Sequence, residues 1–163
     1  MSQHTDSSSN LSPQRRGQRI AMPPEALNEY LTTQRTCRVA SVDKDGHPNV
    51  SPLWFLWFDD ALWLYSLTRS QRWTNLMRDP RVAIVVDDGE AYTELRGVEI
   101  RGTAEAVGPS PRPRDAELPE LAGLEQAFAD KYSGGQVGHD GRHGWLKITP
   151  SKITSWDFTR MGG

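Results

Sequence analysis

A short basic segment holds the residues of this chain that are best suited to chemistry. Between residues 66 and 81, four arginines stand against a single aspartate, so this segment carries +3 while the whole chain carries −2. Ser70 is a good N-cap residue, and the apolar spacing after it predicts a short helix that starts at about Gln71. Free backbone N–H groups and the positive end of that helix would then meet the Ser70 hydroxyl and the guanidinium groups of Arg69 and Arg72. A phosphate group would suit that point.

Asn75 extends this candidate site. It follows Arg72 by three residues, on the side of the predicted helix away from Trp73, so its amide can hydrogen-bond to the same ligand. The alternative is a solvated basic turn whose arginines pair with the acidic residues in 87–94. Charge and spacing leave both interpretations open.

Other candidate clusters point less clearly to chemistry. His139 and His143 are four residues apart, but the glycines around them predict a loop, where that spacing aligns no ligands, so we expect no metal site. Cys37 is the only cysteine, and its Val/Ala-rich surroundings favour a small buried hydrophobic residue. The chain has no Gly-x-Ser-x-Gly motif to support a hydrolase triad and no GxGxxG motif to support a dinucleotide-binding fold.

The elements that must position these residues are mostly strands. Helical periodicity predicts short amphipathic helices over 23–33 and 118–132. Runs of β-branched and aromatic residues predict strands over 37–42, 49–58, 61–67, 81–87 and 98–106, then 145–148 and 152–158 as one interrupted strand or two short ones. Pro52 cannot donate to a ladder, which predicts a bulge or a sheet edge there. This pattern indicates a mainly β fold, a small six-stranded barrel with a few helices.

The aromatic run from Trp54 to Phe58 puts large rings on both faces of its predicted strand. One face belongs to the core. A monomer seldom exposes a second aromatic face, so we expect it to be covered by a partner subunit or by a planar ligand.

Length, composition and charge limit the partners. The 163 residues correspond to one domain, and residues 1–20, which are rich in Ser, Gln and Arg, predict a flexible N-terminal tail before a folded domain over 21–163. A net charge of −2 excludes a whole-protein basic field for nucleic acid or an anionic membrane. The longest apolar run, 53–58, is too short to span a bilayer, and the polar N-terminus does not read as a signal peptide, so we expect a cytoplasmic protein.

Several segments together resemble a known family. Similarity to the split β-barrel superfamily of pyridoxamine 5'-phosphate oxidase is carried by DGHPNVSPLWF, LWLYSLTRSQRWTNLMRDPRVAIVVDD, RGVEIRGTAEAV and KITSWDFTR. Within that superfamily, the chain most resembles the actinobacterial branch of deazaflavin (coenzyme F420)-dependent enzymes. The resemblance covers about Pro23 to Arg160, and its most specific parts are TRSQRWTNLMRDPRV and the terminal SWD.

The resemblance implies a homodimer of six-stranded barrels with two cofactor sites at the subunit interface. Its phosphate-binding motif falls on Arg69, Ser70, Arg72 and Asn75. The strands that would line the cofactor ring carry Ser51, Trp54 and Ser66, and Trp156 matches a tryptophan that closes the partner's site. Many relatives in the deazaflavin branch have Lys at the position of Arg72; arginine keeps the charge and adds a planar fork of donors.

The implied chemistry is hydride transfer by the cofactor ring, for which the protein supplies position, shielding and electrostatics. Our first hypothesis is an F420-dependent oxidoreductase that reduces a small conjugated organic substrate. The second is an FMN-dependent oxidase or reductase of the pyridoxamine-phosphate-oxidase type. A flavin or deazaflavin carrier without turnover and a dimer used only for interaction are the alternatives outside the enzyme class.

Overall fold

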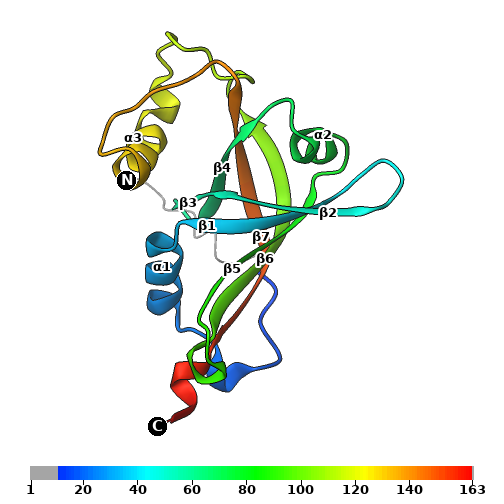
Figure 1. The fold of residues 1–163 in the computed structure, drawn as a ribbon, viewed down its shortest axis with the longest axis vertical. Coiled ribbons are helices and arrows are strands. Elements are labelled where there is room, and N and C mark those ends of the chain that lie inside the picture. Colours follow the sequence, from blue (N-terminus) through cyan, green and yellow to red (C-terminus); the bar gives the residue numbers. More distant parts are fainter. Residues whose placement is uncertain (1–10, 163) are drawn as a thin grey trace, which may run out of the picture.

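The computed structural model describes residues 11–162 and shows a single seven-stranded antiparallel sheet that curls into a half-barrel (Figure 1). The strands are β1 (Thr36–Val42), β2 (Pro48–Trp54), β3 (Leu56–Phe58), β4 (Ala61–Leu67), β5 (Arg81–Asp88), β6 (Arg96–Val107) and β7 (His143–Asp157). Their order in the sheet is β2-β1-β5-β6-β7-β4-β3. The α-helices are α1 (Pro24–Thr33), α2 (Gln71–Arg78) and α3 (Ala122–Tyr132), with short 3-10 helices η2 (Gln18–Ile20), η3 (Tyr92–Glu94), η4 (Pro119–Leu121) and η5 (Phe158–Gly162). The predicted mainly β class is therefore confirmed.

The predicted number of six strands is wrong, because the predicted strand 49–58 is two strands that break at Phe55. β2 pairs with β1, whereas β3 pairs with β4. At the break, the N–H of Phe55 donates to the Tyr132 hydroxyl at 3.1 Å, and the Phe55 carbonyl accepts from that hydroxyl at 2.5 Å and from Lys131 Nζ at 3.3 Å. Side chains of α3 thus bind the backbone groups that a ladder would otherwise pair.

The prolines mark where the sheet is irregular or ends. Pro52 lies on β2, which is an edge strand with continuous register to β1, so the structure has the predicted edge and no bulge there. The two segments predicted near the C-terminus form one strand, β7. Its pairing with β6 shifts register beside Pro150, where Arg101 faces Lys152 and Gly102 faces Pro150. The sheet therefore stays continuous through a local irregularity.

The core lies inside the curled sheet and consists mainly of residues from the strands, from α1 and from α2. Cys37 is fully buried among them, and burial raises the pKa of its thiol to about 12, as expected for a small hydrophobic residue without a reactive thiolate. The fully buried aliphatic members of this core are Leu31, Val39, Leu62, Leu64, Leu76, Ile84, Val86, Val98, Ile100, Leu146 and Ile148. A second cluster forms where α3 packs against Leu56, Trp63 and Trp145.

The helices occupy different ends of the half-barrel (Figure 1). α2 begins at Gln71, as predicted, and inserts Trp73 and Leu76 into the core. α3 lies near the same end of the long strands β6 and β7, whereas η5 lies near the other end. Within residues 11–162, none of the helices is long and apolar enough to cross a membrane.

The predicted N-terminal tail is described only from Leu11 onward, and residues 1–10 lie outside the described residues. From there the chain follows β7. The N–H of Ser12 donates to the carbonyl of Ser151 at 3.0 Å, and Gln14 exchanges two hydrogen bonds with the backbone of Ser155, at 3.0 and 3.1 Å. Residues 11–20 therefore make specific contacts with the sheet.

We predict that Gly97→Ala destabilises the protein. A Cβ at residue 97 would lie 2.2 Å from Cζ2 of Trp156 on the neighbouring strand, so the indole would have to leave its place. Overpacking of this kind costs about 1–3 kcal/mol, which urea unfolding would measure as a lower free energy of unfolding. Gly138→Ala is the matched control, because no atom lies within 4 Å of the Cβ it would add. Equal stability of the two variants would contradict the packing of Trp156 on Gly97.

Candidate functional site

Arg72 is the centre of the candidate site, and it brings together three of the predicted site residues. It projects from the first turn of α2 between β2 and β4. Its Nη1 donates to Ser51 Oγ at 2.6 Å, while Nε and Nη2 donate to Ser66 Oγ at 3.2 and 3.1 Å. Ser51 lies on β2 and Ser66 on β4, two strands that are not neighbours in the sheet. One guanidinium group therefore links the two sides of the half-barrel.

The charge of Arg72 is not balanced by an acidic side chain. Its hydrogen-bond partners are neutral hydroxyls, and among residues 11–162 no carboxylate lies within ion-pair distance of it. Burial disfavours the charged form and lowers the pKa of Arg72 from its usual value, although a guanidinium stays protonated in proteins. A half-buried cation with only neutral partners attracts an anion, which would restore the electrostatic balance.

Ser70 and Arg69 complete the basic turn before α2. Ser70 is the N-cap, as predicted: its Oγ accepts from the N–H of Trp73 at 3.1 Å and donates to the carbonyl of Leu67 at 2.8 Å. This hydroxyl is therefore engaged in capping. The groups at this helix end that could bind a ligand are the first backbone N–H groups, which have no intrahelical acceptor. Arg69 is exposed beside it.

Asn75 does not lie at the surface with Arg72. Its side chain is fully buried, where Nδ2 donates to Ser41 Oγ on β1 at 3.1 Å and Oδ1 accepts from Gln71 Nε2 at 2.7 Å. The amide faces the sheet because α2 packs on β1. Asn75 therefore holds α2 in place in this structure, and its predicted contact with a ligand stays a prediction.

Trp54 is the exposed aromatic residue of the candidate site. It lies at the end of β2, where 51% of it is exposed, and its ring stacks on Tyr132 of α3 with centroids 4.4 Å apart and planes 11° apart. Arg35 lies over the Tyr132 ring, with Cζ 4.9 Å from the centroid. The result is a flat aromatic surface on the β2 side of the sheet, next to positive charge.

Trp156 lies far from the basic turn within one chain. The start of β7 touches α2, since a Cβ at Gly144 would meet the Trp73 ring at 2.8 Å. Trp156 follows twelve residues later on the same strand, which corresponds to roughly 40 Å of extended chain. Only a second chain could bring a Trp156 to the basic turn, so its predicted role depends on a dimer.

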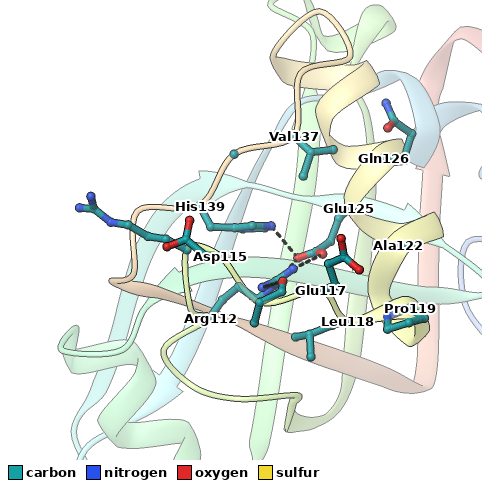
Figure 2. Close-up of a pocket in the computed structure, with 13 residues that line it drawn as sticks. Arg112, Asp115, Glu117, Leu118, Pro119, Ala122, Glu125, Gln126, Val137 and His139 are labelled. Carbon is teal, nitrogen blue, oxygen red and sulfur yellow. Dashed lines mark hydrogen bonds and ion pairs between the residues drawn. The ribbon is translucent and has the colours of Figure 1, made fainter.

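A second polar cluster lies under α3, and none of its members was predicted as a site residue. Arg112, Glu125 and His139 converge where a cleft of about 600 Å³ opens beside α3 (Figure 2). Arg112 holds Glu125 with a two-pronged contact, Nη2 to Oε1 at 2.9 Å and Nε to Oε2 at 3.0 Å, and Trp145 Nε1 donates to Oε2 at 2.9 Å. His139 Nε2 lies 3.1 Å from the same Oε2. This is a buried ion pair with a histidine attached.

The pKa shifts in this cluster follow from burial and from the arginine fork. Burial alone would raise the pKa of Glu125, but the hydrogen bonds from Arg112 and Trp145 outweigh it and hold that pKa below its usual value. Burial also lowers the pKa of His139, and this effect outweighs the attraction of Glu125. At neutral pH the cluster therefore contains a charged carboxylate beside a neutral imidazole.

His139 and His143 have different partners. His143 Nδ1 lies 2.7 Å from Asp140 Oδ2, whereas Nδ1 of His139 lies 2.8 Å from the hydroxyl of Tyr65. In the part of the chain that the structure describes, no group of three or more His, Cys, Asp or Glu side chains could hold a metal ion. Each histidine has a separate local partner.

One signal in the sequence could have revealed this cluster. Leu121, Leu124 and Phe128 form the apolar stripe of the predicted helix, and Glu125 falls on the same stripe, four residues after Leu121. An acidic residue on a buried stripe requires a charged partner. Its partner, Arg112, lies in a proline-rich segment with no periodicity, so sequence spacing does not reveal the pair.

Comparisons with known proteins agree with this fold. A family model described as pyridoxamine 5'-phosphate oxidase matches residues 23–157. The conserved hypothetical protein Rv2991 from Mycobacterium tuberculosis superposes with a TM-score of 0.75 at 28% identity, over 93% of this chain and 94% of that one. An F420 reductase (TM-score 0.60, 24% identity, 80% of this chain and 98% of that one) and a FAD-binding protein from Mesorhizobium loti (TM-score 0.62, 20% identity, 83% and 93%) share the fold. No curated protein matches the sequence.

The family model begins at the N-terminal end of α1 and ends with the last residue of β7, so it includes every strand of the sheet and all three α-helices. The matched residues thus include both the basic turn and the terminal SWD, the two segments that carry the resemblance in the sequence. The protein belongs to the pyridoxamine 5'-phosphate oxidase family.

Proposed function

We propose that this protein is an F420-dependent oxidoreductase, which transfers a hydride between deazaflavin and a small conjugated organic substrate. The observation that carries the proposal is the half-buried guanidinium of Arg72, whose partners among residues 11–162 are two serine hydroxyls and no carboxylate. Such a group at the start of a helix is suited to a phosphate.

The residues around Arg72 fit the phosphate of such a cofactor. Its guanidinium supplies a planar fork of charged donors, and the first turn of α2 adds backbone N–H groups and the positive end of the helix. Exposed Arg69, directly before the N-cap residue, adds a second positive charge to the basic turn. Ser51 and Ser66 hold the Arg72 fork in one orientation, so little side-chain entropy is lost when an anion binds.

Trp54 and the outer face of β2 are suited to a planar ring. This face is opposite the one that carries Ser51, so the ligand would pass around the edge strand to reach Arg72. Val50, Pro52 and Trp54 are alternate residues of β2 and share this face, where Val50 is 70% exposed and Trp54 is 51% exposed. A bound deazaflavin would supply the hydride chemistry at its ring. The protein's own residues would bind the phosphate, stack on the ring and keep water from it.

FMN is the second candidate cofactor, and membership of the pyridoxamine 5'-phosphate oxidase family favours it. FMN carries one terminal phosphate, whereas F420 carries a phosphodiester with an anionic tail, and Arg72 could bind either. The F420 reductase that shares this fold and the resemblance of the basic turn to the deazaflavin branch support F420.

A homodimer is part of the proposal. The exposed apolar face of β2 needs cover, and Trp156 can reach a basic turn only in another chain. In a two-fold symmetric dimer, each site would then take Arg72 from one chain and Trp156 from the other.

We predict that Arg72→Ala weakens F420 binding by at least about tenfold, because it removes charge-assisted hydrogen bonds that contribute about 1.5–3 kcal/mol each. Quenching of the deazaflavin fluorescence would measure the affinity, and circular dichroism would show that the variant is folded. Arg72→Lys should lie between the variant and the wild type, since it keeps the charge but loses the fork.

The matched control is Arg81→Ala. Arg81 belongs to the same basic segment, but its side chain is 81% exposed and pairs with Asp79 beyond the other end of α2. The affinity of the Arg81→Ala variant for F420 should equal that of the wild type. If Arg72→Ala also bound F420 like the wild type, the assignment of the phosphate to Arg72 would be wrong even though the fold is right.

Titration with F420 and with FMN, followed by turnover assays, separates the candidate functions. We expect F420 to bind more tightly than FMN, and reduced F420 to be oxidised in the presence of a quinone, an enone or a nitro compound. Tighter binding of FMN would favour the second candidate. Saturable binding without reduction of any of these compounds would favour a carrier. No binding of either cofactor below about 100 μM, or −5.5 kcal/mol, would contradict both the F420-dependent and the FMN-dependent function.

Mixing two defective variants tests whether the site is shared between chains. Arg72→Ala and Trp156→Ala should each bind F420 weakly. After random exchange of subunits, half of the dimers are mixed, and each mixed dimer regains one site with both native residues, so about a quarter of the sites should recover. Calorimetric stoichiometry would measure that fraction. A mixture with no recovered sites would mean that Trp156 does not act across the dimer.

A further inference from the structure

A small aromatic cavity lies under α3, next to the exposed Trp54. Its volume is about 250 Å³. Most of its wall is aromatic or small, and its members include Trp54, Tyr65, Phe128, Ala129, Tyr132 and Trp145. A cavity of about 150 Å³ already accepts benzene, so this one has room for a single substituted ring.

The buried polar part of the wall is the pair Glu125 and His139, while Ser133 and Gln136 also line the cavity but are exposed. Glu125 and His139 also line the outer cleft of Figure 2, so they form the partition between that cleft and the inner cavity. Both side chains are nine-tenths or more buried, with 5% of Glu125 and 7% of His139 exposed. Buried polar groups at the end of an apolar cavity give it chemical selectivity.

The charge of Glu125 determines which nitrogen of His139 carries the proton. Glu125 is ionised, because Arg112 and Trp145 donate to it, and an ionised carboxylate only accepts hydrogen bonds. His139 is neutral and has one N–H. Since Nε2 is the nitrogen that faces Glu125 Oε2 at 3.1 Å, the proton belongs on Nε2. The N–H does not point directly at the oxygen, so charge attraction rather than a well-directed hydrogen bond favours this tautomer.

The tautomer of His139 in turn determines the direction of the next hydrogen bond. With its proton on Nε2, the ring has a lone pair on Nδ1, which lies 2.8 Å from the Tyr65 hydroxyl. Tyr65 must therefore donate its proton to His139. Burial and the nearby Asp140 and Glu125 raise the pKa of Tyr65 to about 12, so the hydroxyl keeps that proton at neutral pH. Its oxygen then offers only lone pairs to the cavity that Tyr65 lines.

We propose that this cavity binds a compact hydroxylated aromatic ligand, whose hydroxyl donates a hydrogen bond to the oxygen of Tyr65. The series of contacts from Arg112 through Glu125 and His139 to Tyr65 makes the Tyr65 oxygen a hydrogen-bond acceptor. The site therefore selects a phenol over an ether or ketone of the same shape. The aromatic wall supplies the contacts to the ring. Because Trp54 belongs both to this wall and to the predicted ring-lining strand, the ligand would lie beside the cofactor ring; this last step rests on the proposed function.

The test uses the cofactor-free protein and two probes of nearly equal shape, 4-methylphenol and 4-methylanisole, by isothermal titration calorimetry at pH 7. We expect one site per chain and about tenfold tighter binding of the phenol, because the ether cannot donate to Tyr65. Tyr65→Phe keeps the ring and removes the acceptor, so the two probes should bind it equally. Tyr92→Phe is the matched control: Tyr92 is 69% exposed, and its loss of a hydroxyl should leave the preference unchanged.

A second variant locates the probe. Ala129 is buried and lines the cavity, so Ala129→Leu should fill the space and abolish binding of both probes while leaving Tyr65 and His139 in place. Equal affinity of the wild type for the two probes, no binding of either, or an unchanged preference in Tyr65→Phe would overturn the proposal. Binding of the phenol without binding of F420 or FMN would support this site and contradict the proposed function. Binding of F420 or FMN without binding of the phenol would support the proposed function and contradict this site.

Discussion

The position of the Arg72 guanidinium is the constraint on which most of the other features depend. It donates to Ser51 on β2 and to Ser66 on β4, strands separated by four others in the order of the sheet. A sheet that curls but does not close leaves two sides without a ladder between them. Here a cation and two hydroxyls connect those sides. Withdrawing a guanidinium from water is costly, and neutral partners offset only part of that cost, which leaves the connection short of negative charge.

The placement of α2 follows from the same requirement. Ser70 caps the helix, Trp73 anchors it in the core, and the buried Asn75 ties it to Ser41 on β1. With α2 held by these three contacts, Arg72 lies where it donates to Ser51 on β2 and to Ser66 on β4. The side-chain amide of Asn75 therefore helps to hold the helix that carries Arg72.

α3 has a comparable role on the other side of the candidate site. Tyr132 and Lys131 bind the backbone of Phe55, which ends β2 and begins β3, and Tyr132 also supports the ring of Trp54. On its buried face, Glu125 begins the chain of contacts that leads through His139 to Tyr65. A flat aromatic surface and a polarised cavity thus share one helix as their support.

The sequence by itself determined what depends on neighbours in the chain. The N-cap at Ser70, the helix start at Gln71, the basic turn and the strand over 61–67 all follow from residues within a few positions of one another, and the structure agrees with them. The mainly β class and the edge at Pro52 follow from the same local physics.

Only the tertiary structure decided the contacts between distant residues. The break at Phe55 depends on side chains more than 75 residues later, so the predicted strand 49–58 has no local reason to end there. The burial of Asn75 depends on which face of α2 meets β1, and the pairing of Arg112 with Glu125 joins an aperiodic segment to a helix. Local periodicity specifies which element forms, but the partner of a buried polar group is specified by packing, and packing is a property of the whole chain.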